Sequence, residues 1–281
     1  MLILLPPSEG KRAPAPPTDS PGLGSYTATG DPVDPAALWL GKLAPARRRV
    51  LNRLVAMCRR GSPRGVASSL ATLGLSAAQH GEVARNAALP GAPTAPAAEV
   101  YTGVLYEALG AATLAPDARA WLDERAVIFS GLWGVLRMAD RVPAYRCPVG
   151  VSLPVVGGLT AYWKKVLGPA LDRVAADGPV LDLRSGAYGA MWAPGPKPAM
   201  HTAALRVLHE HVVDGVPQRS VVSHFNKATK GRLVRALAES GAAPGSVDEL
   251  VSVLRDLKHT VEERPAPAGR PRQLDLVVPE I

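Results

Sequence analysis

The stretch Phe129-Ser130-Gly131-Leu132-Trp133-Gly134-Val135-Leu136-Arg137 is the most specific local sequence in this 281-residue chain. It continues an apolar run at residues 127–129 that is typical of a buried strand, and its two glycines flank Leu132 and Trp133. Glycine permits close approach of the backbone, and the free N–H groups at the start of a helix attract anions. The stretch therefore predicts a strand, a tight turn and a helix, with Gly131 and Gly134 facing an anion.

A glycine-bearing hairpin of this kind holds a DNA phosphate in helix-hairpin-helix motifs, although the spacing here is G-x-x-G rather than G-x-G. Nearby arginines, Arg137, Arg141 and Arg146, carry the forked guanidinium that suits phosphate. A structural alternative is that Trp133 is buried in a tight turn and that Arg137 pairs with Asp140.

Short apolar runs alternate with helical patterns along the chain, which indicates an α/β or mixed α+β fold. The helical patterns include residues 160–176 and 200–213, and residues 86–98 have the composition of a loop. We find no internal repeat and expect a single domain over residues 1–281, with an unusual mixed-sheet core. Strands are predicted at residues 2–5, 127–129, 180–183 and 221–223, and a hairpin with a long tip at residues 257–263 and 273–278.

Composition excludes several classes of protein. With 47% apolar and 20% charged residues, the chain is not intrinsically disordered, and no run of 18 apolar residues could span a bilayer. The first residues reach prolines too early for a secretion signal, so we expect a cytoplasmic protein without a membrane partner. Two cysteines, Cys58 and Cys147, cannot build a disulfide framework or a four-ligand zinc site. We therefore expect no metal and no cofactor.

Positive charge is concentrated in one segment. Residues 35–81 contain no Asp or Glu, and their eight Lys and Arg residues equal the whole net charge of +8. Apolar residues from Val50 to Cys58 recur at helical spacing, which predicts a helix with one packed face and one cationic face. That face is either a solvated helix surface or a binding surface for a polyanion. The cations are Lys42, Arg47, Arg48, Arg49, Arg53, Arg59, Arg60 and Arg64.

The predicted strands all end in small or polar residues. Ligands bind at the carboxyl ends of strands in sheets built from crossover units, so these ends predict one shared pocket. Ordinary turn chemistry is the alternative, because serine and glycine are common in turns. The predicted pocket residues are Ser8, Lys11, Ser130, Asp182, Ser185, Ser223 and Lys227.

Cations also cluster at the predicted strand-to-helix junction of residues 223–232. Lys227, Lys230 and Arg232 are poorly placed against the dipole of the helix that follows, which favours a bound anion there. The segment is not a P-loop, and Lys227 is also a candidate nucleophile.

Other aromatic residues and histidines are less informative. Tyr101 and Tyr106 either stack on bases or pack in a core, and Trp163 is expected in the core. The histidines at 201, 209 and 211 are expected to be structural or exposed.

Taken in order, these segments resemble the YaaA family of bacterial peroxide stress proteins. The chain opens with Leu4-Leu5-Pro6-Pro7-Ser8-Glu9-Gly10-Lys11, and matching segments follow over nearly its whole length. Where the family commonly has Asn-Leu-Ala-Ser-x-Glu-Tyr, this chain has Asp182-Leu183-Arg184-Ser185-Gly186-Ala187-Tyr188. The other matches are residues 100–103, 129–137, 145–146, 163–164 and 223–232.

The resemblance implies a cytosolic mixed α/β protein with a positively charged cleft and a helix-hairpin-helix-like element that binds double-stranded DNA. It also implies a role in limiting peroxide damage, and it carries no established catalytic residues. The first hypothesis is therefore a DNA-binding protein without strong sequence specificity. Its phosphate ligands would be Lys11, Gly131, Gly134, Arg137, Arg146, Lys227, Lys230 and Arg232.

The alternative hypothesis is an enzyme that acts on a nucleotide, a nucleobase or another small anionic ligand in the pocket at the strand ends. Its candidate catalytic residues are Lys227, Ser223, Asp182 and Ser185.

Overall fold

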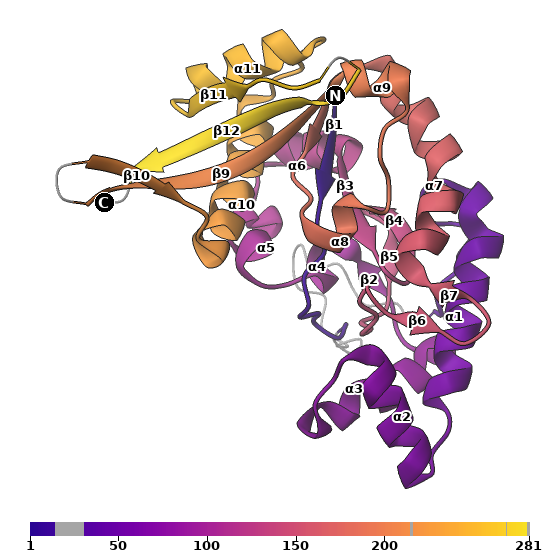
Figure 1. The fold of residues 1–281 in the computed structure, drawn as a ribbon. Helices are drawn as coiled ribbons and strands as arrows, with labels where there is room; N and C mark the ends of the chain where they lie inside the picture. Colours follow the sequence, from indigo (N-terminus) through magenta and orange to yellow (C-terminus); the bar gives the residue numbers. More distant parts are fainter. Residues whose placement is uncertain (15–30, 214–215, 268, 280–281) are drawn as a thin grey trace.

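A mixed eight-stranded sheet runs through the centre of the computed structural model, which describes residues 1–14, 31–213, 216–267 and 269–279 (Figure 1). Neighbouring strands from β12 to β3 are parallel, and antiparallel strands complete both edges. The order is β11 (Thr260–Arg264), β12 (Arg272–Pro279), β9 (Thr202–Val213), β8 (Val180–Asp182), β1 (Leu2–Leu5), β3 (Ala126–Ser130) and β4 (Gly134–Arg137), while β10 (Val216–Ser220) pairs with β9.

The central strand β1 is short and wholly apolar, and all four of its residues are buried. Leu4 lies between Val127 of β3 and Asp182 of β8 in the register of the sheet. Because the three strands are parallel and in step, the segments that leave their carboxyl ends begin at one edge of the sheet.

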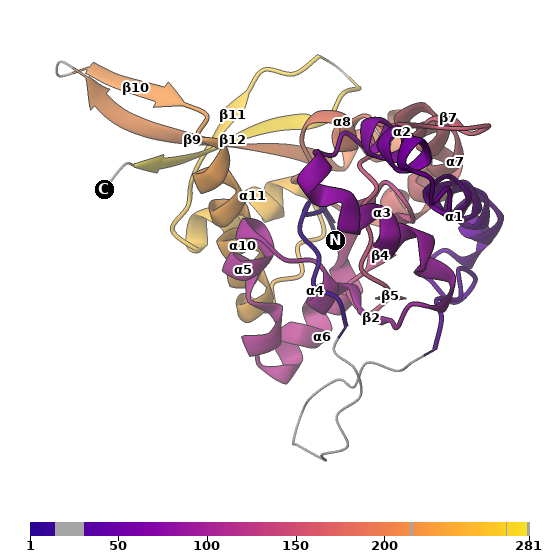
Figure 2. The same cartoon turned by 90° about the horizontal axis from the view of Figure 1, so that it is seen from below.

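Helices cover the sheet on two sides (Figures 1 and 2). Helices α5, α6 and α10 lie together on one side, and α1 and α7 lie on the other, while α2 and α3 form a small helical group at the bottom of the view in Figure 1. The longer helices are α1 (Ala44–Cys58), α2 (Pro63–Leu73), α3 (His80–Ala87), α5 (Val104–Leu109), α6 (Pro116–Arg125), α7 (Leu159–Val174), α10 (Ser223–Ser240) and α11 (Val247–Asp256).

Short elements connect these layers. Two small two-stranded sheets pair β2 (Ala95–Pro96) with β5 (Arg141–Val142) and β6 (Ser152–Leu153) with β7 (Gly157–Gly158). The short helices are α4 (Ala97–Val100), α8 (Gly186–Gly189) and α9 (Pro196–Met200). No helix in the described part of the chain is long and apolar enough to cross a membrane.

Most predicted elements are confirmed. The mixed α/β class is correct, as are β1, β3 and β8, the β11–β12 hairpin, and the helices α1 and α7. Residues 86–98 hold the end of α3, a short 3-10 helix and β2, so that segment is only partly a loop.

The prediction of a helix at residues 200–213 is wrong, because this segment forms β9. Its buried positions include Ala203, Leu205, Val207 and His209, which are two residues apart as in a strand. The predicted strand at residues 221–223 is also wrong. The pairing with β9 belongs to β10 just before it, and Ser223 is the first residue of α10.

The glycine-bearing stretch joins two strands, so the prediction of a helix after it is wrong. Gly134 has a φ of +76°, which turns the chain back so that β4 pairs antiparallel with β3. Val135 and Leu136 are fully buried in that pairing.

Candidate functional site

The carboxyl ends of β1, β3 and β8 lead into a cluster of lysine, tyrosine and serine side chains. Residues 6–11 follow β1, Ser130 is the last residue of β3, and Asp182 is the last residue of β8. Tyr101 and Tyr145 come from distant segments of the chain and meet at Ser130.

Three buried hydroxyl groups form a chain of short hydrogen bonds. The hydroxyl oxygens of Tyr101 and Tyr145 are 2.6 Å apart, and that of Tyr145 is 2.6 Å from Ser130 Oγ. The backbone N–H of Trp133 donates to Ser130 Oγ at 2.8 Å. Tyr101 and Tyr145 are each 2% exposed and Ser130 is 0% exposed. Burial raises the pKa of both phenols, so they stay protonated at neutral pH.

Lys11 lies over these tyrosines. Its Nζ is 4.4 Å from the ring centroid of Tyr145 and 4.9 Å from that of Tyr101, and it donates to the carbonyl oxygen of Ser8 at 2.9 Å. Withdrawal of the ammonium from water lowers the pKa of Lys11 to about 8, despite the opposing attraction of Glu9. The Lys11 amine is therefore uncharged more often than that of an ordinary lysine near neutral pH, although most of it stays protonated at pH 7.

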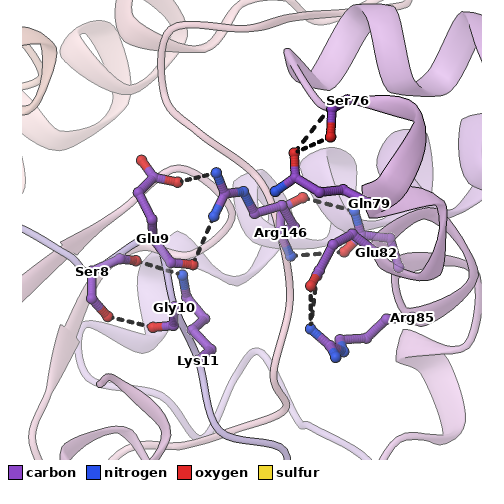
Figure 3. A network of polar contacts seen from close by, with 10 residues as sticks. Ser8, Glu9, Gly10, Lys11, Ser76, Gln79, Glu82, Arg85 and Arg146 are labelled. Atoms are coloured by element: carbon purple, nitrogen blue, oxygen red, sulfur yellow. Dashed lines mark hydrogen bonds and ion pairs between the residues drawn. The ribbon is translucent and has the colours of Figure 1, made fainter. Parts of the chain in front are cut away.

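Arg146 fixes the loop that carries Lys11 (Figure 3). Its Nη2 is 2.7 Å from Glu9 Oε2, and its Nη1 donates to the carbonyl oxygen of Glu9 at 3.0 Å. Its backbone N–H and carbonyl are both bonded to the side chain of Asn86, at the end of α3. The predicted phosphate ligand Arg146 therefore already has a carboxylate partner.

Asp182 and Arg184 form a buried bidentate pair. Arg184 Nε and Nη2 donate to the two carboxylate oxygens of Asp182 at 2.9 and 2.7 Å. The guanidinium also donates to the carbonyl oxygen of Trp192 and lies 4.2 Å above the ring centroid of Phe129. Asp182 is thus tied to a cation, whereas the predicted pocket residue Ser185 is exposed.

The cations of α10 are divided between the core and the surface. Lys230 is buried and its Nζ donates to the carbonyl oxygen of Leu183 at 2.8 Å, and burial lowers the pKa of its amine. Lys227 and Arg232 are exposed. The side chain of Ser223, a predicted pocket residue, lies outside the described part of the structure.

The turn at Gly131 and Gly134 is packed inside the protein. Leu132 and Trp133 are 0% exposed, and the indole N–H of Trp163 donates to the carbonyl oxygen of Gly131 at 2.8 Å. The predicted phosphate contacts of this turn stay predictions, and the packing favours its structural interpretation.

Arg137, the last residue of β4, is only partly exposed. Its guanidinium stacks 4.4 Å from the ring centroid of Trp39, and its backbone N–H, not its guanidinium, donates to Asp140 at 2.9 Å. The expected pairing with Asp140 therefore takes a different form, and most of the guanidinium is turned toward the protein.

The cationic face of α1 is present, with one correction. Arg47 is 0% exposed, so it belongs to the packed face of the helix. It precedes Val50 and Leu51 by three and four positions, and these three side chains therefore share one face. Among the described residues, the other cations of this segment form a single ion pair, which joins Arg48 to Asp34 at 3.8 Å. The exposed cations are Lys42, Arg48, Arg49, Arg53, Arg59, Arg60 and Arg64.

Both cysteines are buried, and their thiol groups stay protonated at neutral pH. Burial raises the pKa of Cys58 to about 11 and that of Cys147 to about 12. Within the residues that the structure describes, no group of three or more His, Cys, Asp and Glu side chains could hold a metal ion.

We expect the two thiols of the native protein to react slowly with an aromatic disulfide reagent at pH 7.5. The thiolate is the reactive form, and at these pKa values less than ~0.1% of either thiol is ionised. The release of reagent chromophore should become rapid only in urea. Stoichiometric labelling of the folded protein within seconds would contradict this expectation.

The fold and the site define a mixed α/β protein with two buried tyrosines beneath a partly covered lysine at the strand ends and a separate arginine-rich helical surface. The chain belongs to the family described as peroxide stress protein YaaA, whose model matches residues 1–263. It is 46% identical to a UPF0246 protein of Streptomyces coelicolor over the full length of both chains. It is also 38% identical to a UPF0246 protein of Corynebacterium efficiens, over 99% of this chain and 100% of that one.

One departure from the family pattern is explained by the structure. Aspartate and arginine stand at positions 182 and 184, where the family commonly has asparagine and alanine. The two side chains pair with each other, 2.7 Å apart at their closest atoms. The extra positive charge of Arg184 is therefore neutralised locally by the extra negative charge of Asp182.

Proposed function

We propose that this protein binds duplex DNA during the response to hydrogen peroxide, without strong sequence specificity. The observation that supports this most is the surface of α1 and its neighbours. Seven exposed cations lie there, from Lys42 to Arg64, in a segment that contains no acidic residue. Such a surface attracts the phosphate backbone and releases the counterions of DNA.

Arginine spacing on α1 suits an extended polyanion. Arg49 and Arg53 are four residues apart and lie on the same face of a helix. A helix of 15 residues is about 22 Å long, so its cations can reach several successive phosphates. Guanidinium contacts to phosphate carry no base information, which accounts for the lack of sequence specificity.

The predicted ligands on α10 form a second cationic region. Lys227 and Arg232 are exposed, but α10 and α1 lie on opposite sides of the molecule in both views (Figures 1 and 2). Lys11 and Lys230 are engaged with backbone carbonyls at the strand ends. The proposal therefore centres on the α1 surface rather than on a single cleft shared by all the predicted cations.

We expect the double variant Arg53→Ala/Arg60→Ala to bind duplex DNA more weakly and with a shallower salt dependence. Each lost phosphate contact lowers the slope of log affinity against log salt by about 0.9, so the slope should fall by nearly 2. The measurement is fluorescence anisotropy of two unrelated labelled duplexes between 50 and 200 mM salt.

The matched control is Arg255→Ala/Arg270→Ala, which removes the same charge from exposed arginines in and near the α11 and β11 region. This variant should keep the wild-type slope. Equal effects of the two double variants would show that only net charge matters, and the absence of wild-type binding at low salt would refute the proposal.

The partly covered Lys11 supports a second candidate function, an enzyme with its centre at this residue. Among the candidate catalytic residues from the sequence, Asp182 is paired with Arg184 and Lys227 is exposed. Lys11, in contrast, is desolvated over the rings of Tyr101 and Tyr145, whose hydroxyl groups are linked to Ser130. Titratable groups with such shifts are frequent at functional sites.

A further inference from the structure

The hydroxyl groups of Tyr101, Tyr145 and Ser130 have one more O–H proton than their mutual hydrogen bonds use. Tyr101, Tyr145 and Ser130 contribute three O–H protons, and their two mutual hydrogen bonds consume two of them. The third bond of the chain is donated to Ser130 by the backbone N–H of Trp133. Among the described residues, no acceptor is found for the remaining O–H. The cluster therefore holds a donor that is ready for an oxygen atom of a ligand.

Lys11 adds further unused donors. An ammonium group has three N–H donors, and the described contacts of Lys11 use one, toward the carbonyl oxygen of Ser8. The described residues place no carboxylate within ion-pair distance, since the nearby carboxylate of Glu9 is bonded to Arg146. Lys11 is only partly covered, and its other described contacts are with the ring faces of Tyr101 and Tyr145. The remaining N–H donors of Lys11 are therefore available to a ligand that approaches from the open side.

We propose that Lys11 is a nucleophile that condenses with an aldehyde, whose carbonyl oxygen is bound by the hydroxyl chain of Tyr101, Tyr145 and Ser130. The amine lone pair attacks the carbonyl carbon, and the C=O π electrons move to the oxygen, which takes a proton from the hydroxyl chain. One nitrogen proton returns to the hydroxyl chain, and the resulting carbinolamine loses its other nitrogen proton and its hydroxyl group as water. The product is an imine, and no oxidant or reductant is needed.

The protonation state and the setting of Lys11 suit this step. With a pKa of about 8, about a quarter of the amine is uncharged at pH 7.5, against about 0.1% for an ordinary lysine. Lys11 is only partly covered, and its loop neighbours Glu9 and Gly10 are exposed. A ligand can therefore approach from the carboxyl edge of the sheet.

Two sources can supply the aldehyde. One is a free small aldehyde, and the other is the ring-opened deoxyribose of an abasic site in DNA. The second source rests on the proposed DNA-binding function, whereas the first does not. The chemistry at Lys11 is the same in both cases.

The test is reductive trapping of the imine on the full-length protein. Glycolaldehyde in one arm, and a duplex with a single abasic site in the other, are incubated with cyanoborohydride and the adducts are mapped by peptide mass spectrometry. We expect adduct at Lys11 to exceed that at any of the other seven lysines by about tenfold or more, and to increase from pH 6.5 to 8. Adduct spread evenly over the lysines, or concentrated elsewhere, in both arms would overturn the proposal.

Variants distinguish a nucleophilic role of Lys11 from a purely structural one. Lys11→Arg retains the charge but should lose the adduct, and Tyr145→Phe, which interrupts the hydroxyl chain, should slow trapping by about tenfold. Lys164→Arg, which alters an exposed lysine of α7, should leave labelling at Lys11 unchanged. The wild-type map decides the question even where a variant folds poorly.

The two trapping reactions, together with the measured binding of intact duplex, distinguish the proposed nucleophile from the proposed DNA-binding function. Labelling of Lys11 by glycolaldehyde alone supports the nucleophile with a free aldehyde as its ligand. Labelling by the abasic duplex supports DNA as the source. Normal binding of intact duplex with no adduct at Lys11 in either arm refutes the nucleophile and leaves the proposed function standing.

Discussion

Replacement of Arg47 with methionine is expected to lower the free energy of unfolding by about 3–5 kcal/mol. The Arg47 side chain is fully buried, and every hydrogen bond of its guanidinium within the described residues goes to a backbone carbonyl oxygen. Its Nε donates to Trp133 at 3.0 Å, and its Nη2 donates to Trp39 at 2.6 Å and to Val135 at 2.9 Å. Arg47 thereby ties α1 to the turn before β4 and to the segment preceding α1.

The expected loss of stability is large because the carbonyl oxygens that accept from Arg47 remain buried when the arginine is replaced. Methionine fills much of the same space but donates no hydrogen bond, so several carbonyl groups would be buried without partners. Burial also lowers the pKa of Arg47 to about 10, with Asp140 opposing the shift. The folded protein therefore bears a desolvation cost that these hydrogen bonds and the charge of Asp140 offset.

Arg48→Met is the matched control, because it makes the same change at the adjacent position of the same helix. Arg48 is exposed and its pair with Asp34 spans 3.8 Å, so we expect a change within about 0.5 kcal/mol. Urea denaturation followed by circular dichroism measures both variants. Similar midpoints for Arg47→Met and the wild type would show that the carbonyl groups find other donors.

The sequence was sufficient for elements whose pattern is local. The apolar runs of β1, β3 and β8 lie between turn residues, and the spacing of Val50, Leu51, Leu54 and Val55 fixes the packed face of α1. That spacing also contained the signal that Arg47 is buried. Residues 47–49 are all arginine. Only their positions around the helix axis distinguish the buried Arg47 from the exposed Arg48 and Arg49.

The strand β9 was missed for a different reason. Leu205, Leu208 and Val212 also fit a helical spacing, and the period-2 pattern becomes visible only when β8 and β12 are known to flank the segment. Tertiary pairing decided between two patterns that the local sequence allows.

The candidate site was predictable in part. Lys11 and Ser130 were expected at the strand ends, and the structure places both beside the same two tyrosines. The meeting of Tyr101 with Tyr145 could not be predicted, because these residues are 44 positions apart and nothing in their local pattern distinguishes core packing from base stacking. The pairing of Asp182 with Arg184 could have been predicted from the sequence, because two residues of opposite charge only two positions apart can form a local bidentate bond.

Gly134→Ala is expected to destabilise the protein by about 3–5 kcal/mol, as the sum of two effects. The φ of Gly134 is +76°, a conformation that costs an alanine about 1–2 kcal/mol. A Cβ atom there would also lie 2.7 Å from Cζ3 of Trp163, whose ring is fully buried and fixed by its bond to Gly131. The indole has no room to move aside, so the second effect adds to the first.

Gly157→Ala isolates the conformational effect. Gly157 has a φ of +83°, and its Cβ would meet no atom within 4 Å, so this variant should lose only about 1–2 kcal/mol. The difference between the two variants in urea denaturation measures the contact with Trp163. Equal losses would show that the β3–β4 turn adjusts freely.

Duplex affinity of the folded Gly134→Ala protein then decides what the turn does. Because the turn is buried against α7 and Arg47, the folded fraction should bind duplex DNA with the wild-type salt dependence. A variant of wild-type stability with a steep loss of affinity would instead mean that backbone N–H groups of this turn contact phosphate, since a side chain at Gly134 would displace several donors together. The measured stability and affinity therefore separate a packed turn from a phosphate-binding hairpin with one substitution.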